Sequence, residues 1–121
     1  MRRESKIQVE IIRRLAGERR IRVWRNNTGS LQDPSGRWIQ FGLVGSSDLL
    51  GILAPGGQLL AIEVKSETGK LSKEQRAFGE MVERFGGVYV VARSVADVES
   101  ALSPWLTDTQ KPKQQSSADG S

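Results

Sequence analysis

Two acidic residues and a lysine, Asp48, Glu63 and Lys65, interrupt the apolar middle of the sequence. A carboxylate among apolar neighbours in a strand is costly to desolvate unless another charge compensates it. A divalent cation is such a partner, because hard cations such as Mg²⁺ bind carboxylate, water and phosphate oxygens. A lysine nearby can orient or deprotonate the attacking water, or stabilise charge on a phosphate. The three residues therefore indicate metal-dependent chemistry on a phosphate ester.

The segment between these residues predicts a hairpin that would bring them together. Residues 49–53 and 59–64 are apolar and flank Ala-Pro-Gly-Gly-Gln, which is typical of the turn between two antiparallel strands. If the turn centres on its two glycines, residues whose numbers sum to about 112 face each other. Asp48 is then expected opposite Val64 and one step from Glu63.

The residues alone leave two interpretations of this charged cluster open. Side chains alternate across a strand, which places Glu63 and Lys65 on one face and Ile62 and Val64 on the other. A lone Glu-x-Lys pair is most commonly a solvated strand end with an incidental ion pair. The apolar setting and the neighbouring Asp48 favour the metal site.

The pattern resembles a known nuclease signature. Asp48 followed, after a turn, by Glu63-Val64-Lys65 is similar to the Asp…(Asp/Glu)-x-Lys motif of the PD-(D/E)xK nuclease superfamily. The resemblance is to its virus-type replication-repair nuclease (VRR-NUC) family in particular, and it covers residues 4 to 100. The matching elements are residues 45–51, Gly56-Gly57, residues 62–66 and Gln75. One departure is Ser47, which stands where the superfamily name has proline, as is common in this family.

The resemblance implies a fold and a chemistry. The implied fold is α/β, a restriction-endonuclease-like αβββαβ core with a mixed sheet flanked by helices. The implied activity is a Mg²⁺- or Mn²⁺-dependent DNA endonuclease that hydrolyses phosphodiester bonds. The expected catalytic residues are Glu4, Asp48, Glu63, Lys65 and Gln75, and the expected metal ligands are Asp48, Glu63, Val64 through its carbonyl, and Glu4. Lys65 would position or activate the water, and Gln75 would support the lysine or a bound water.

A first helix is predicted from Glu4 to residue 16, because apolar residues recur there at helical spacing. At about 100° per residue, Glu4 and Gln8 fall inside the apolar arc, whereas Glu10 points elsewhere. Position alone leaves Glu4 with two explanations: a first-turn acid favoured by the helix dipole, or a third carboxylate directed at the metal site. The resemblance favours the second, since residues 4–8 are similar to the family's Glu-x-x-x-Gln start. Glu10 remains the alternative carboxylate, and Gln8 is expected to support the site.

The stretch before the hairpin predicts two strands and a rim that could contact DNA. The strands are residues 21–25 and 37–41, joined by a loop over 26–36 that is rich in turn residues and amides. The candidate DNA contacts are Arg25, Asn27, Arg37, Ser47 and Lys70, with Trp24 or Trp38 available for stacking. Taken singly, each arginine is also explained as part of a solvated strand face, and each tryptophan as core.

A helix is predicted after the hairpin. Ser72-Lys-Glu-Gln75 fits a capping box, in which the serine caps the helix and the residue three later returns the bond. Two glycines at 86–87 end the helix. Its buried face is expected to contain Phe78, Met81, Val82 and Phe85. Gln75 therefore has a structural explanation as well as the functional one.

The chain then predicts one more strand and one more helix. Residues 88–92 are an apolar strand, whose Tyr89 is interpreted as a core residue and not as a nucleophile. A helix over 95–102 is stopped by Pro104. The order is helix, three strands forming a meander, helix, strand, helix. The passage from 63 to 92 should be a right-handed parallel crossover.

Composition bounds the remaining possibilities. The chain has 121 residues, enough for one domain, with 18 Lys plus Arg against 14 Asp plus Glu and a net charge of +4. A modest positive charge is consistent with a polyanionic partner. No cysteine and no histidine occur, which excludes thiolate zinc sites and every triad or nuclease chemistry that uses histidine. The sequence predicts a soluble cytoplasmic protein of a bacterial or phage-infected cell, with no membrane contact.

The domain is expected to span residues 1–106, followed by a polar tail at 107–121 that is predicted to be disordered. Small stand-alone VRR-NUC members resemble phage-encoded, dimeric resolvases of four-way (Holliday) junctions in DNA repair and recombination. The resemblance therefore implies branched DNA as substrate and a homodimer, whose two sites would suit symmetric nicking. The alternatives are a flap or restriction-type nuclease of the same fold, or a non-catalytic DNA-binding module.

Overall fold

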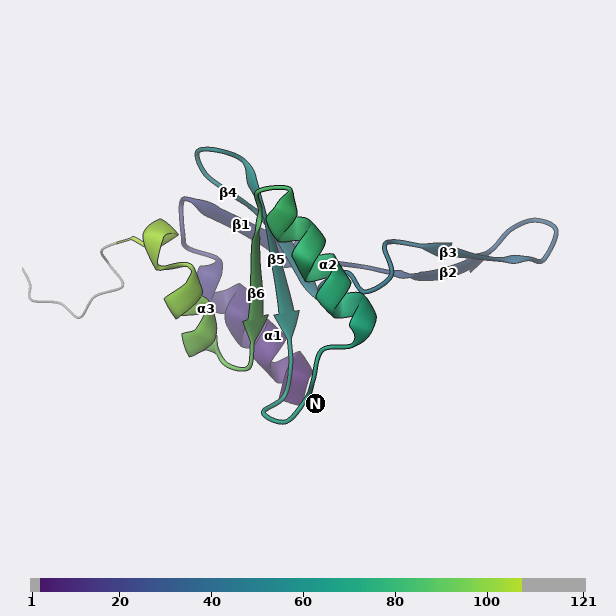
Figure 1. The fold of residues 1–121 in the computed structure, drawn as a ribbon, viewed down its shortest axis with the longest axis horizontal. Coiled ribbons are helices and arrows are strands. Elements are labelled where there is room, and N and C mark those ends of the chain that lie inside the picture. The colour runs from purple at the N-terminus through teal and green to yellow at the C-terminus, as the bar shows by residue number, and fades with distance from the viewer. Residues whose placement is uncertain (1–2, 108–121) are drawn as a thin grey trace, which may run out of the picture.

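A four-stranded mixed sheet forms the centre of the molecule (Figure 1). The computed structural model describes residues 3–107. The sheet has the order β1-β4-β5-β6 and contains β1 (Ile21–Arg25), β4 (Leu49–Leu53), β5 (Gln58–Val64) and β6 (Val88–Ala92). The strands β1, β4 and β5 are antiparallel neighbours, while β6 runs parallel to β5. The predicted meander, parallel crossover and mixed sheet are confirmed.

Helices cover both faces of this sheet. The helices are α1 (Arg3–Leu15), α2 (Lys73–Arg84) and α3 (Val95–Ala101), followed by the short 3₁₀ helix η1 (Ser103–Trp105). The apolar residues of α1 and α3 pack with Ile62 and Val64 on one face, in the larger core. On the other face, Phe78 and Val82 of α2 pack against Ala61. Since strand side chains alternate, Glu63 belongs to the face that α2 covers.

Both long helices begin where the sequence signals predict. In α1 the residues Ile7, Ile11 and Leu15 are buried at helical spacing. The capping box of α2 is present, because Gln75 N–H donates to Ser72 Oγ at 3.0 Å and Ser72 N–H donates to Gln75 Oε1 at 2.8 Å. Phe85 was expected in the buried face of α2, and this was wrong. It lies just past the last helical residue, and 80% of it is exposed.

The register of the central hairpin differs by one residue from the prediction. Leu49 pairs with Ile62, so facing residues sum to 111 and Asp48 lies opposite Glu63. The difference arises because four residues, an even number, connect the paired residues Leu53 and Gln58. Continuing the pairing one step places the two carboxylates face to face.

The region before the hairpin forms a second sheet that the sequence did not predict. The expected loop over 26–36 contains β2 (Gly29–Gln32), which pairs with β3 (Trp38–Phe41). These strands do not join the central sheet; they form a two-stranded ribbon, residues 29–41, which we call the arm. Figure 1 shows the arm projecting away from the body of the molecule. The predicted strand at 37–41 is therefore part of the arm.

The turn of the arm is built by local hydrogen bonds. A carboxylate oxygen of Asp33 accepts from the Ser35 N–H at 3.0 Å and from the Arg37 N–H at 2.9 Å. Gly36 adopts a left-handed backbone with φ of 92°, which a glycine tolerates without steric cost. These bonds close the turn and align the two strands of the arm.

The predicted domain spans residues 1–106 and the predicted tail 107–121, whereas the structure describes residues 3–107. Between residues 3 and 107 the three α-helices and four of the six strands form one body around the central sheet, and β2 and β3 form the arm. Residues 108–121, nearly all of the predicted tail, lie outside the described part. In residues 3–107 no helix is long and apolar enough to cross a membrane.

Candidate active site

Asp48 is fixed at the start of β4 by its own backbone and its side chain. Its Oδ2 accepts a hydrogen bond from the Val64 N–H at 2.8 Å, across the hairpin. Its backbone carbonyl accepts from the Asn26 N–H at 2.9 Å, which extends the pairing of β1 with β4. The carboxylate is therefore held at the end of β5, beside Glu63.

Glu63 lies under α2 and is almost completely buried, with 3% of its surface exposed. Its Oε2 accepts a hydrogen bond from the Nε2 of Gln75 at 2.9 Å. Its Oε1 is buried and has no hydrogen-bond partner within residues 3–107. A buried carboxylate oxygen without a partner is costly, so this atom needs a proton or a cation that the protein itself does not supply.

The electrostatics of the site support the same conclusion. Burial, together with the charge of Asp48, raises the pKa of the Glu63 carboxyl from 4.5 to about 8. The Asp48 carboxyl, which can share the proton of a protonated Glu63, and the charge of Glu4 add to this shift in pKa, and Lys65 opposes it. The two facing carboxylates are thus close enough to compete for one proton. A divalent cation between them would replace that proton, so the residues present fit such an ion.

The structure joins Glu4, not Glu10, to the site. Oε2 of Glu4 accepts from the Ser66 N–H at 3.2 Å, directly after Lys65. Glu10 is exposed and lines a different cleft. Within residues 3–107 no group of three or more acidic, histidine or cysteine side chains converges as a metal site. Glu4 therefore contributes charge and a backbone contact, and the expectation that it is a third metal ligand receives no support.

The remaining residues predicted for the site occupy different positions. Lys65 follows β5, is partly buried, and acts electrostatically on Glu63. Gln8 is half-buried one turn after Glu4, and no hydrogen bond joins it to the site in the described part of the chain. The oxygen of Gln75 completes the predicted cap of α2, and its nitrogen donates to Glu63, whereas the sequence analysis expected it to support Lys65 or a bound water.

The candidate DNA contacts are dispersed. Arg25, Asn27 and Lys70 are exposed on the body of the molecule. Arg37 lies at the turn of the arm, where it forms an ion pair with Asp33 at 3.7 Å, and it is not part of the site. Ser47 is 1% exposed. The burial of its side chain does not favour the prediction that Ser47 contacts DNA.

Asn26 was missed by the sequence analysis. Its side-chain amide donates to Ser46 Oγ at 2.7 Å and to the Ser47 carbonyl at 2.9 Å. Asn26 therefore fixes the segment that leads into Asp48. Its position follows from the antiparallel pairing of β1 with β4, which places the residue after β1 beside the residues before β4.

Arg93 was missed as well. Its Nη1 donates to the carbonyls of Ser66 and Gly69, at 2.6 and 2.7 Å. Because β6 runs parallel to β5 and Val64 pairs with Ala92, the next residue on each strand lies close to the other. Arg93 thus holds the turn that follows Lys65.

Tyr89 on β6 packs against α2 and contacts the start of that helix. Its hydroxyl donates to the backbone carbonyl of Gln75 at 3.3 Å. Burial raises the pKa of Tyr89 to about 12, so the hydroxyl keeps its proton at neutral pH. Gly79 leaves room for the ring, since a Cβ at that position would lie 2.4 Å from Tyr89 Cε2.

The chain is similar to one protein family in sequence and to two solved structures in fold. The VRR-NUC domain matches residues 2–96. A solved structure described as a VRR_NUC domain is 25% identical, with a TM-score of 0.60, over 85% of this chain and 97% of its own. A second, described as a VRR_NUC domain protein, is similar in fold, with 18% identity and a TM-score of 0.56 over 87% of this chain and 88% of its own. No curated protein matches the sequence. The match over most of the chain shows that it belongs to the VRR-NUC domain family.

Proposed function

We propose that the protein is a divalent-metal-dependent endonuclease that hydrolyses phosphodiester bonds in DNA. The VRR-NUC domain is a nuclease domain of the PD-(D/E)xK type, a group that generally uses divalent metals. The observation that supports this proposal for this chain is the buried, partnerless Oε1 of Glu63 facing Asp48. Burying an uncompensated carboxylate destabilises the fold, so a strand end with a purely structural role is not expected to contain one.

The site contains the residues that would bind the ion and the residues that orient those ligands. Asp48, Glu63 and the carbonyl of Val64 would bind Mg²⁺ or Mn²⁺, which when bound supplies positive charge that activates water and stabilises the transition state. The Val64 N–H orients the Asp48 carboxylate, and Gln75 orients that of Glu63. In this proposal Lys65 positions the attacking water.

The proposed substrate is branched DNA, in particular a four-way junction, cut by a homodimer. Two copies of one site related by a two-fold axis would suit paired nicks in a symmetric junction. Arg25, Asn27 and Lys70 are exposed residues that could contact phosphates. A flap or restriction-type nuclease with the same site is the second candidate, and the cytoplasm of a bacterial or phage-infected cell is the proposed location.

The test is cleavage of an immobile four-way junction against matched duplex, flap and single-stranded DNA, with Mg²⁺, Mn²⁺ or EDTA. Wild type and Asp48→Ala are compared. Paired symmetric nicks that are lost with EDTA and in the variant support the junction resolvase. Cutting of flaps alone keeps the site and replaces the substrate. DNA binding without any cutting contradicts the proposal and favours a non-catalytic DNA-binding module.

A further inference from the structure

One face of the arm is apolar, and the opposite face is polar apart from Trp38, which is 70% exposed. Leu31 pairs with Ile39, and Gly29 with Phe41, so these side chains share a face. The opposite face carries Ser30, Gln32, Trp38 and Gln40. The apolar face is exposed, with 64% of Leu31, 51% of Ile39 and 40% of Phe41 accessible. No residue between 3 and 107 covers this face, although a two-stranded ribbon is marginally stable in water unless another layer packs against it.

The body of the molecule also has an apolar surface that the described part of the chain leaves exposed. Because α2 packs mainly on β5 and β6, with Leu50 of β4 also in its cluster, it leaves the same sheet face uncovered over β1, the later part of β4 and the start of β5. Trp24, Ile52 and Leu59 are exposed there, with Ile52 directly opposite Leu59. Phe85 lies just past the last residue of α2, and Gln58 at the start of β5 donates to the Gly86 carbonyl at 3.0 Å, which places the end of α2 beside the start of β5. We call Trp24, Ile52, Leu59 and Phe85 the open face.

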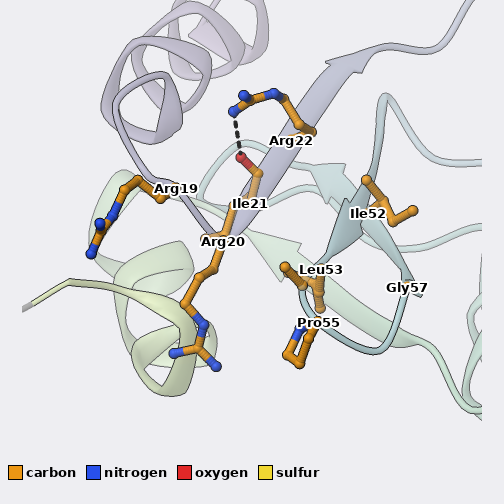
Figure 2. A pocket seen from close by; sticks show the side chains of 9 residues that line it. Arg19, Arg20, Ile21, Arg22, Ile52, Leu53, Pro55 and Gly57 are labelled. Carbon is orange, nitrogen blue, oxygen red and sulfur yellow. Dashed lines mark hydrogen bonds between the residues drawn. The ribbon is translucent and has the colours of Figure 1, made fainter.

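A hollow extends the open face toward the turn between β4 and β5 (Figure 2). It measures about 190 Å³ and includes Ile52 together with Leu53 and Pro55. Arginines form its rim, and the side chain of Arg22 bends back so that Nη1 donates to the Ile21 carbonyl at 3.4 Å. This hollow can bind apolar side chains, because its base is apolar and the methylene groups of the surrounding arginines add apolar surface.

The arm of the same chain does not cover the open face. Figure 1 shows the arm leaving the body on the side away from the turn between β4 and β5. We propose that two copies of the chain exchange arms, so that the apolar face of each arm packs on the open face of the other copy. Such a contact is reciprocal and closes with two-fold symmetry. It gives both unpartnered surfaces a partner in one step.

The charge of the arm favours a protein partner over nucleic acid. Between residues 29 and 41 the charged residues are Asp33 and Arg37, which pair with each other. A surface that binds DNA needs unpaired cations to neutralise phosphates. The apolar face of the arm has none.

The area is sufficient for a dimer. The exposed parts of the seven apolar side chains, three on the arm and four on the open face, amount to roughly 700 Å² per protomer on typical side-chain areas. A stable interface buries about 800 Å² per partner. Over both protomers this is roughly 1,400 Å², which lies within the range of about 1,200–2,000 Å² for stable interfaces.

The first experiment measures mass in solution by light scattering. We expect wild type to be a dimer and Ile39→Asp to be a monomer, because a charge on the apolar face cannot be buried without a partner. Gln40→Asp is the matched control, since it places the same charge on the polar face of the same strand, and it should remain a dimer. Circular dichroism and thermal melting establish that both variants keep a folded body. A monomeric wild type, or a dimeric Ile39→Asp variant, overturns the proposal.

The second experiment locates the contact, using a chain that has no cysteine of its own. Chains with Ile39→Cys are mixed with chains with Ile52→Cys and joined by a short bismaleimide linker. A linked pair from this mixture is expected, and a much lower yield from the control mixture of Gln40→Cys with Ile52→Cys. Equal yields, or no linked pair from a dimeric protein, contradict arm exchange. Mass and cross-links are read without DNA cleavage, so the result does not depend on the proposed function.

Discussion

One side chain connects the cap of a helix to the buried carboxylate of Glu63: Gln75 donates to Glu63 Oε2 at 2.9 Å while its own oxygen accepts from the Ser72 N–H at 2.8 Å. The start of α2 is thereby tied to the end of β5. The orientation of Glu63 depends on a local helix signal, the capping box. Variants of Gln75 and Ser72 should therefore affect stability alike but cleavage activity differently.

Gln75→Ala should lower both stability and cleavage rate. The loss of its part of the cap should cost about 1 kcal/mol, and the loss of the bond to Glu63 should lower metal affinity or activity about 10- to 100-fold. Ser72→Ala is the matched control, because it damages the same cap without touching Glu63. Denaturant unfolding and cleavage rates are measured for both. Equal activity losses in the two variants would show that Gln75 acts through the helix alone.

The raised pKa of Glu63 predicts how stability depends on pH without metal. Its pKa is about 8 in the folded chain against an ordinary value of 4.5, so between these values the folded state binds more protons than the unfolded state. Stability should therefore decrease as pH rises from about 4.5 to about 8. Glu63→Gln removes this contribution. Thermal melts in EDTA across this range should show a smaller decrease for Glu63→Gln than for wild type, and parallel curves would refute the assignment.

Metal binding should show the opposite dependence on pH. An ion that binds the Glu63 carboxylate must displace its proton, so affinity for Mn²⁺ should increase with pH up to about 8, in line with the raised pKa. Calorimetry in buffers of different ionisation enthalpy measures the protons released. Release of a proton at pH 7 is expected from wild type and not from Glu63→Gln. Affinity that is independent of pH would argue against Glu63 as a ligand.

Asn26 should matter more than its neighbour Asn27. Asn26 donates to Ser46 and Ser47 and fixes the approach to Asp48, so Asn26→Ala should weaken Mn²⁺ binding about 10-fold or more. Asn27 is exposed, and Asn27→Ala should leave metal binding unchanged. Titration calorimetry with Mn²⁺ compares the two. If both variants bind like wild type, Asn26 does not position Asp48.

Gly79→Ala should destabilise the protein, although alanine normally favours a helix interior by about 1 kcal/mol. The added Cβ would meet the ring of Tyr89 at 2.4 Å, and such overpacking costs about 1–3 kcal/mol. Gly17→Ala is the control, since its Cβ would meet no atom within 4 Å, and it should change stability by less than about 1 kcal/mol. Denaturant unfolding decides, and a stabilised Gly79→Ala would contradict the packing.

The parts of the fold that were predicted correctly depend on signals that lie within a few residues. The capping box at Ser72 and the apolar strand at 88–92 are both of this kind, and both are present. Alternation also placed Ile62 and Val64 in the core on the face opposite Glu63. In these segments local preference and tertiary packing agree.

The parts that were not predicted depend on pairing and on turn length. Gly29–Gln32 has weak strand preference and becomes a strand because Trp38–Phe41 pairs with it. The hairpin register shifted by one because the number of residues in the turn is not fixed by the glycines alone. The contacts of Asn26 and Arg93 follow from strand order, which no local pattern gives.

The central claim is that Asp48 and Glu63 form the metal site of a nuclease, and the most direct measurement is the rate of phosphodiester cleavage by Glu63→Ala in saturating Mg²⁺. The variant keeps the sheet and removes the carboxylate that carries the partnerless oxygen. The account predicts a rate at least about 10³-fold below that of wild type. A rate close to that of wild type would contradict it.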